Sequence, residues 1–140
     1  MKPAGTKPPR GFSALPRPSP FNALVGPLFA RRTKGRELCV GLRIEEKHTN
    51  SRGICHGGVL ATLADLSLGY AMHAKTQGRM SFVTAHLAVD YAGAARIGDW
   101  IESRVEIQRM GSRLAFANCY LVAGDRRIVR ASAIFARADK

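Results

Sequence analysis

The most restrictive feature of the sequence is one long apolar run, residues 57–74, with the sequence GGVLATLADLSLGYAMHA and no proline. As a helix, its 18 residues would be about 27 Å long. Apolar side chains lie around almost the whole circumference of this helix, so we expect protein to cover it on all sides. Because the run also contains Asp65, His73 and many small residues, it is unsuited to span a membrane. The sequence therefore predicts a buried central helix and no membrane span.

Segments in which apolar and polar residues alternate flank this helix. One strand is expected at 38–45, and four more are expected after the helix, at 80–91, 99–109, 112–123 and 126–137. Glycine-containing turns separate these four strands, and the last two turns are short enough for hairpins. A curved antiparallel sheet wrapped around one helix would bury the apolar faces of both, so we expect an α+β domain of this architecture.

The N-terminal segment differs in composition from the rest of the chain. Its first 20 residues hold six of the seven prolines, which prevent a regular helix. We expect a disordered, basic, proline-rich tail over residues 1–20 and a single domain over residues 21–140. Apolar residues at helical spacing from Phe21 predict that this domain opens with a short docking helix, which is broken or ends near Gly26 and Pro27.

The excess of positive charge is concentrated near the N-terminus. Residues 1–36 hold eight basic residues and no acidic one, and the remaining 14 basic and 10 acidic residues give the domain a net charge of only +4. Such a domain lacks the dense basic stripe, interleaved with aromatic residues, that is typical of nucleic-acid binding. We therefore expect no nucleic-acid partner.

The three cysteines, Cys39, Cys55 and Cys119, form an odd number and show no C-x-x-C spacing. Zinc sites and thioredoxin-like redox sites are typically built on that spacing. We interpret the cysteines as reduced thiols in a cytoplasmic protein without a metal site.

Asp65 is the candidate catalytic residue. Its neighbours one turn away on the predicted helix are Ala61, Thr62, Leu68 and Gly69, and none of them is a charge partner. An unpaired carboxylate is costly to bury, and a carboxylate held in a pocket is suited to act as a general base or a nucleophile. The alternative is a solvated Asp65 on an exposed stripe of the helix.

A second group of candidate residues, Asn50, His56, Gly57 and Gly58, lies at the start of the same helix. Free backbone N–H groups and the positive end of the helix dipole meet there, and such groups stabilise developing oxyanions. The two glycines allow another group to approach the backbone closely, and Asn50 can add an amide donor.

The two groups of candidates are too far apart to act within one chain. Eight residues of helix separate Gly57 from Asp65, a rise of about 12 Å, so one substrate carbonyl cannot touch both. We therefore expect them to meet from different subunits of a homodimer, paired antiparallel about a two-fold axis, with two composite sites.

The run NSRGICHGGVLATLAD, residues 50–65, closely resembles the signature of hotdog-fold acyl-CoA thioesterases of the phenylacetate-pathway (PaaI-like) branch. The resemblance continues through VTAHLAVDYAGAA and RMGSRLAF and covers roughly residues 37–137. It implies a hotdog fold and hydrolysis of an acyl-CoA thioester to a free acid and coenzyme A. It also implies a homodimer that joins its sheets edge to edge and pairs again into a homotetramer. No metal or other cofactor is implied, since coenzyme A enters as part of the substrate.

The resemblance also implies roles for single residues. Asp65 would be the general base or nucleophile, with Thr84 holding the attacking water beside it. Gly57 N–H and Asn50 would polarise the thioester carbonyl, supported by His56. The positions at which relatives contact coenzyme A are occupied here by Arg109, Gly111, Ser112, Arg113 and Arg137.

The remaining candidate substrate contacts are Gly58 and His86. We expect His86 to share a strand face with Thr84 and to line the acyl pocket, with a purely structural histidine as the alternative. Other expected determinants of pocket depth are apolar residues of the helix and the strand after it: Leu60, Leu63, Leu68, Tyr70 and Phe82.

Two other functions stay open at the level of sequence. A hotdog hydratase or dehydratase also uses a carboxylate and a histidine, but both must reach one substrate carbon, and the absorbance of an enoyl thioester would reveal its activity. A non-catalytic acyl-CoA-binding or regulatory module is the second alternative, because the acid-free N-terminal segment suits an anionic partner. Salt-dependent DNA binding that requires residues 1–36, without hydrolysis, would favour that module.

Overall fold

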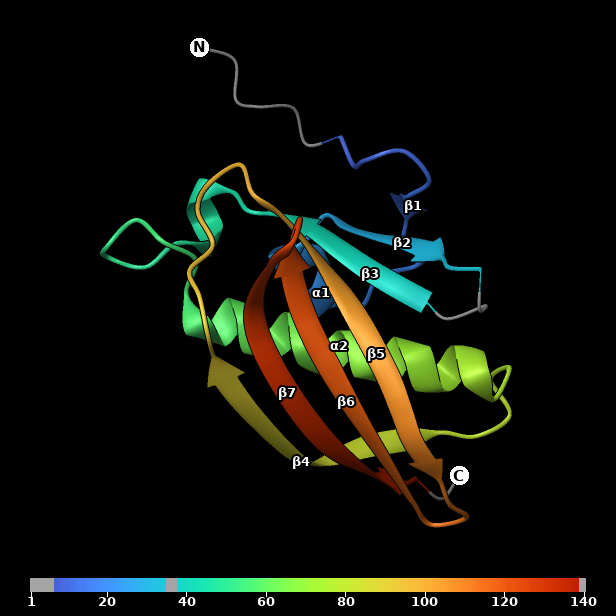
Figure 1. The fold of residues 1–140 in the computed structure, drawn as a ribbon. Coiled ribbons are helices and arrows are strands. Elements are labelled where there is room, and N and C mark those ends of the chain that lie inside the picture. The colour runs from blue at the N-terminus through green and yellow to red at the C-terminus, as the bar shows by residue number, and fades with distance from the viewer. Residues whose placement is uncertain (1–6, 35–37, 139–140) are drawn as a thin grey trace.

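The computed structural model describes residues 7–34 and 38–138 and shows one curved antiparallel sheet around a long helix (Figure 1). The strands follow the sheet order β1-β2-β3-β5-β6-β7-β4. The elements in chain order are β1 (Ser13–Ala14), α1 (Pro20–Val25), β2 (Leu28–Arg32), β3 (Leu38–Arg43), a 3-10 turn (Glu46–His48), α2 (Gly57–Lys75), β4 (Phe82–Tyr91), β5 (Trp100–Met110), β6 (Leu114–Ala123) and β7 (Arg126–Arg137). The predicted series of a strand, a long helix and four strands is confirmed, and β1 and β2 were not predicted.

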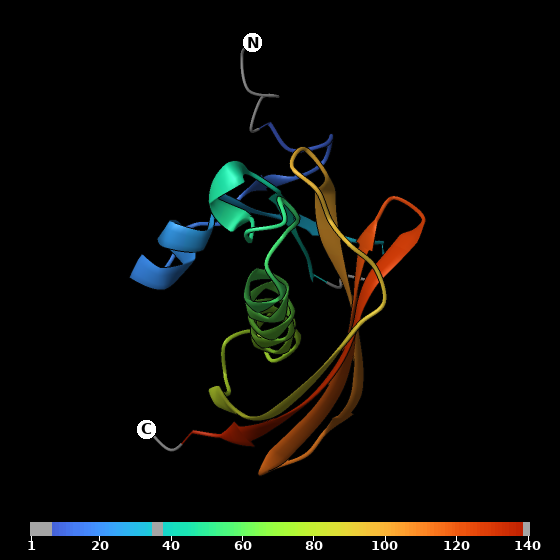
Figure 2. The ribbon, with the colours of Figure 1, turned by 90° about the vertical axis from the view of Figure 1, so that its left-hand side faces the viewer.

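Helix α2 lies in the concave face of the sheet, as the end-on view in Figure 2 shows. It ends where Gln77 and Gly78 adopt positive φ angles of 53° and 71°, a conformation that glycine tolerates at a helix end. The Gly78 N–H donates to the carbonyl of His73 at 2.9 Å, which closes the last turn.

The sheet covers only one side of α2. The fully buried helix residues, which include Leu63, Ala64 and Leu68, pack against the strands. On the other side lies a stripe of small and polar residues that are partly or fully exposed: Gly58, Thr62, Asp65, Gly69 and His73. The expectation that protein covers the helix on all sides is therefore wrong for the single chain, because one curved sheet can cover only one side of a helix.

A short part of the segment expected to be a tail instead joins the sheet. Ser13–Ala14 pairs with β2, and the ring of Phe12 packs edge-on against Trp100 with ring centroids 4.9 Å apart. Trp100 lies so close to Gly41 that a Cβ there would come within 2.1 Å of its ring. The predicted tail over residues 1–20 is thus wrong for residues 12–15, because apolar side chains in the proline-rich segment have an aromatic surface to cover. Residues 1–6 lie outside the described residues.

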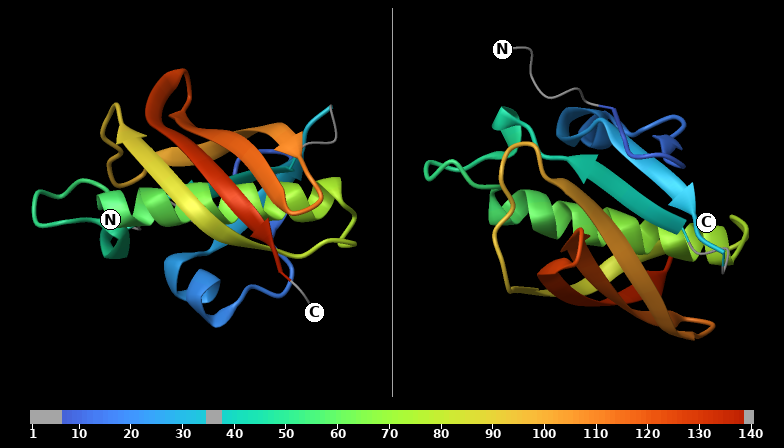
Figure 3. Two further views of the ribbon diagram at one scale, coloured as in Figure 1. Left: turned by 90° about the horizontal axis from the view of Figure 1, so that it is seen from below. Right: turned by 45° about the horizontal axis from the view of Figure 1, so that its top comes forward.

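Strand β4 forms the edge of the sheet on the side of the open helix stripe. It pairs with β7 on one side and crosses α2 obliquely (Figure 3). This crossing brings the beginning of β4 to the middle of α2 and the end of β4 to the beginning of α2.

Candidate active site

The side chains of Asp65 and Thr84 meet where β4 crosses the middle of α2. The Thr84 hydroxyl donates to Asp65 Oδ1 at 2.6 Å, a short, charge-assisted hydrogen bond. Asp65 lies on the open stripe, as the alternative interpretation held, but it is half-buried and held by a partner. The bond fixes one carboxylate oxygen and leaves the other for a second ligand.

A cavity of about 650 Å³ opens beside this pair. Its other walls include Gly69, Tyr70, Phe82 and Phe135, and its volume is in the range of small-molecule sites. Tyr70 and Phe82 therefore lie where the sequence predicted. The leucines expected with them are instead in the core, with exposed fractions of 0–2%: Leu60, Leu63 and Leu68.

Helix α1 also contributes to this cavity, through Asn22. The Asn22 side-chain amide donates to the Tyr70 hydroxyl at 3.1 Å, and Ser19 caps α1 by accepting from the Asn22 N–H. Sequence reasoning missed Asn22, because 48 residues separate it from Tyr70 and no local pattern connects them.

The loop before α2 holds the helix start in place. His56 is the N-cap, and its Nδ1 accepts from the Gly58 N–H at 2.8 Å. The Asn50 side-chain oxygen accepts from the Arg52 N–H at 2.9 Å, so the amide nitrogen of Asn50 takes no part in this turn. Among the described residues, none accepts from the Gly57 N–H. Of the two glycine amides at the helix start, the Gly58 N–H is therefore in use and the Gly57 N–H is available.

The groups that approach the two glycines closely belong to the same chain. The Gly57 carbonyl accepts from the Tyr91 hydroxyl at 2.7 Å, and a Cβ on Gly57 would lie 3.2 Å from the Tyr91 ring. A Cβ on Gly58 would lie 3.0 Å from His56 Nδ1. Tyr91 was not identified from the sequence. It lies seven residues beyond Thr84, and no local sequence pattern indicates its contact with Gly57.

The prediction that His86 shares a strand face with Thr84 is wrong. The register between β4 and β7 shifts between Thr84 and His86, and a bulge of this kind reverses the alternation of side chains. Beyond it, Leu87 and Val89 pack against the core, so His86 lies on the outer face of the sheet. Its candidate role in the acyl pocket is not supported by this geometry.

The residues assigned to coenzyme A lie around the β5–β6 turn and the end of β7. Gly111 closes the turn by donating its N–H to the Leu114 carbonyl at 2.9 Å, and Ser112 and Arg113 are exposed. The Arg137 N–H donates to the Arg113 carbonyl at 2.8 Å. Arg113 and Arg137 are thus brought together.

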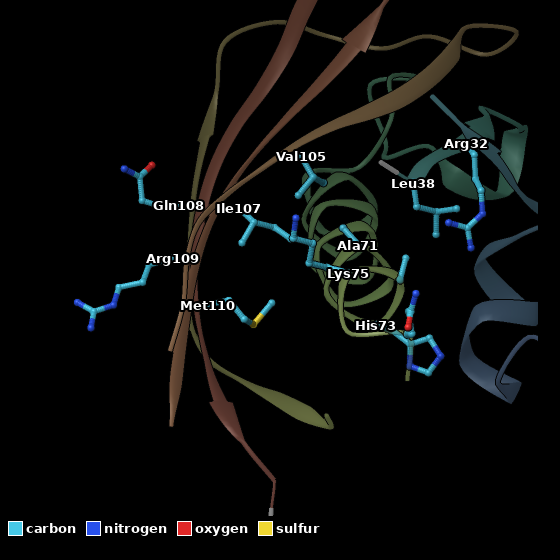
Figure 4. A pocket seen from close by; sticks show the side chains of 12 residues that line it. Arg32, Leu38, Ala71, His73, Lys75, Val105, Ile107, Gln108, Arg109 and Met110 are labelled. Atoms are coloured by element: carbon cyan, nitrogen blue, oxygen red, sulfur yellow. The ribbon is translucent and has the colours of Figure 1, made fainter. Parts of the chain in front are cut away.

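The side chain of Arg109 lies on the outer face of the sheet (Figure 4). A register shift between Ile107 and Arg109 turns it away from the helix, together with Gln108, whereas Met110 points back toward the helix. Arg109 is thus separated by the sheet from the cavity beside Asp65.

The three cysteine thiols are unsuited to nucleophilic catalysis. Burial raises the pKa of Cys55 and Cys39 to about 11 and that of Cys119 to about 12. The reactive form of a cysteine is the thiolate, which is scarce at neutral pH when the pKa is this high. Cys55 directly precedes His56 in the sequence, but the two do not form a catalytic cysteine–histidine pair, because the raised pKa keeps the Cys55 thiol protonated at neutral pH.

Neither a metal centre nor a membrane-spanning helix is found in the part of the chain that the structure describes. No group of three or more His, Cys, Asp or Glu side chains within residues 7–34 and 38–138 could hold a metal ion. Within the same residues, no helix is long and apolar enough to cross a membrane.

The known sequences that resemble this chain are those of thioesterases and esterases. The family model described as Thioesterase superfamily matches residues 52–130. A candidate esterase of Pseudomonas aeruginosa is 46% identical over 127 residues, which are 91% of this chain and 95% of that protein. Human acyl-coenzyme A thioesterase 13 is 27% identical over 108 residues, 76% of each chain.

Solved structures share the fold. The phenylacetic acid degradation protein PaaI of Thermus thermophilus, solved as a mutant, is 22% identical with a TM-score of 0.75, over 86% of this chain and all of that one. A Bacillus halodurans protein solved with CoA is 18% identical with a TM-score of 0.79, over 89% of this chain and 83% of that one. The sheet wrapped around one helix is thus the architecture of PaaI.

Proposed function

Because this chain belongs to the thioesterase superfamily and has its hotdog fold, we propose that it hydrolyses acyl-coenzyme A thioesters at two composite sites of a homodimer. The reaction yields a free acid and coenzyme A. Support for coenzyme A comes from the name of the human relative and from the CoA bound in the Bacillus structure. The further pairing of two dimers into a tetramer and the cytoplasmic location stay predictions.

The observation that carries the proposal is the hydrogen bond between Thr84 and Asp65 beside an open cavity. It orients a carboxylate without neutralising it, and Asp65 forms no ion pair with the described residues. A free carboxylate oxygen that faces a cavity of substrate size is suited to accept a proton from water or to attack a carbonyl.

The edge position of β4 supports a two-chain site. An exposed edge strand is a template for pairing with another chain, and two copies of β4 related by a two-fold axis run antiparallel. The Thr84 end of one copy then lies beside the Tyr91 end of the other. Since Thr84 contacts Asp65 and Tyr91 contacts Gly57 within each chain, Asp65 of one copy approaches Gly57 of the other.

In this arrangement the two copies divide the chemistry. The Gly57 N–H and the Asn50 amide of one copy bind the thioester oxygen as negative charge develops on it. Asp65 of the other copy, acting as a base, takes a proton from water while the water oxygen attacks the carbonyl carbon. The C–S bond then breaks, and the proton passes from Asp65 to the departing thiolate.

A second course of reaction uses the same residues. If Asp65 attacks the carbonyl carbon itself, the thiolate leaves and takes a proton from solvent, and water then hydrolyses the resulting anhydride. Single turnover in ¹⁸O-labelled water detects the nucleophilic course when water attacks the anhydride at the Asp65 carboxyl carbon. Label then enters the Asp65 carboxylate, whereas the base course places label only in the free acid.

The substitution Asp65→Asn tests the enzymatic proposal. It keeps the shape and the acceptor oxygen for Thr84 but removes the proton acceptor, so we expect the rate to fall by about a thousandfold with no loss of melting temperature. The assay measures thiol release from a panel of acyl-CoA thioesters. The control is Asp90→Asn, which removes a carboxylate paired with Arg130 at 3.0 Å. An undiminished rate for Asp65→Asn would refute the assignment.

A further inference from the structure

A second cavity arises because β3 and β5 separate after a short stretch of pairing. Within the described residues, the two strands pair between Gly41–Arg43 and Trp100–Glu102 and nowhere else. One residue before the paired stretch of β3, the Val40 N–H donates to the Ser103 hydroxyl at 2.9 Å instead of to a backbone carbonyl of β5. From there the strands diverge (Figure 1), and a cavity of about 820 Å³ lies between them and the last turns of α2. We refer to it as the β3–β5 cavity.

One wall of the β3–β5 cavity is apolar, and the rest of the lining is polar or charged: Arg32, His73, Lys75, Gln77, Gln108 and Arg109. Its walls include Leu38 of β3, Ala71 of α2, and Val105, Ile107 and Met110 of β5. The last three point toward the helix in Figure 4, because the register shift in β5 turns Gln108 and Arg109 to the outer face. Strand β5 therefore presents a continuous apolar wall to the cavity.

Two cations lie against this apolar surface. Lys75, in the last turn of α2, extends toward Ile107, and Arg32, at the end of β2, lies beside Leu38 (Figure 4). Neither forms an ion pair with a carboxylate of the described residues. An alkyl chain bearing one acidic group complements such a site, since the chain removes apolar wall from water and the acid pairs with the cations.

We propose that the β3–β5 cavity binds the anion of an aliphatic carboxylic acid, with its carboxylate at Lys75 and Arg32 and its alkyl chain against Ile107 and Met110. The cavity volume is within the roughly 300–1,000 Å³ range of small-molecule sites. Neither the acid pair Asp65–Thr84 nor the helix start takes part in this binding.

The cavity is distinct from the cavity beside Asp65, although His73 lines both. Its lining residue Ala74 lies on the opposite side of α2 from Asp65, because a separation of nine positions along the helix amounts to two and a half turns. Binding here therefore does not require hydrolysis, and it stands or falls independently of the proposed function.

Calorimetric titration of the full chain with sodium decanoate tests the proposal. We expect Ile107→Trp to abolish binding by filling the cavity, and Lys75→Gln to weaken it about tenfold by removing a charged partner. The matched controls are Arg104→Gln, which removes an exposed charge of β5, and Gly69→Leu, which narrows the other cavity at a glycine with open space around it. Both controls should bind decanoate as the wild type does.

The outcomes separate the two cavities. Loss of binding in Gly69→Leu with retention in Ile107→Trp would place decanoate at the candidate active site and overturn the proposal, as would absence of binding to the wild type. Equal affinity for decyltrimethylammonium would show that the cations play no part. Should Ile107→Trp fail to fold by circular dichroism, Lys75→Gln decides, because this exposed side chain contributes little to the core: unchanged affinity overturns the proposal.

Discussion

The start and the middle of α2 carry the two halves of the candidate site, and the chain treats them differently. At the start, His56 binds the Gly58 N–H and Tyr91 binds the Gly57 carbonyl. At the middle, Asp65 has one hydrogen bond to the described residues, from the Thr84 hydroxyl, and faces a cavity. One half is fixed by its own chain, and the other is left open to a ligand.

This difference matches what each half has to do. An amide that stabilises an oxyanion is effective only if it is oriented in advance, and contacts around it supply that orientation. A carboxylate that takes a proton from water must instead stay accessible to water. We therefore expect substitutions that remove a contact at the helix start to lower stability, and substitutions at the middle to change the rate alone.

The largest expected effect comes from mixed dimers, in which one chain is defective at the helix start and the other is defective at the middle of the helix. Asn50→Ala should lower the rate about a hundredfold, the typical cost of losing an oxyanion donor. If one site draws on two chains, co-expression of Asn50→Ala with Asp65→Asn restores one intact site in each mixed dimer, and activity rises to about a quarter of the wild-type value. Thiol release by the co-purified mixture measures it.

The matching control for Asn50 is Asn50→Asp. It keeps the oxygen that accepts from the Arg52 N–H but loses the amide donor, so its melting temperature should stay near that of the wild type while its rate falls. Mixed dimers as inactive as both parent variants would show that each site lies within one chain.

A smaller effect is expected from Thr84→Val, which changes only the open half. Loss of the hydroxyl that donates to Asp65 Oδ1 should lower kcat about tenfold, the equivalent of one hydrogen bond to a charged group. KM and the melting temperature should change little, because Thr84 is exposed. Thr84→Ser retains the hydroxyl and should recover most of the rate. A Thr84→Ser enzyme as slow as Thr84→Val would contradict the role of the bond.

The smallest effect is expected from Tyr91→Phe, which loosens the fixed half. It removes the hydrogen bond to the Gly57 carbonyl and should lower the free energy of unfolding by about 1 kcal/mol. Urea denaturation measures the change. Tyr120→Phe is the control, since the Tyr120 hydroxyl bonds to no described residue and its ring packs against Arg127. An equal loss of unfolding free energy in both variants would show that the hydrogen bond from Tyr91 to Gly57 does not stabilise the helix start.

Local pattern in the sequence was enough to predict α2 and the four strands that follow it. The apolar run at 57–74 and the period-two segments each encode their own element, and α2 begins at Gly57 as expected. Asp65 stood out for a local reason as well, since it is the one acidic residue of that run. The resemblance to a known family added Thr84, and in the structure the Thr84 hydroxyl donates a hydrogen bond to Asp65.

Features that depend on contacts between distant residues were missed or wrongly predicted. Residues 12–15 contain no strand pattern of their own, and they join the sheet because Phe12 covers Trp100. The face of His86 followed from strict alternation, which the bulge in β4 interrupts. A bulge depends on how two strands align, and neither strand records it alone.

By itself, the sequence determined the type and order of the main elements and the carboxylate in the middle of the helix, because hydrophobic periodicity and the cost of burying a charge are local properties. Only the tertiary structure decided that α2 keeps an open stripe, that Tyr91 reaches Gly57 and that β3 and β5 part to leave a cavity. These features depend on where segments far apart in the chain meet, and sheet curvature and register, rather than residue pattern, determine those meetings.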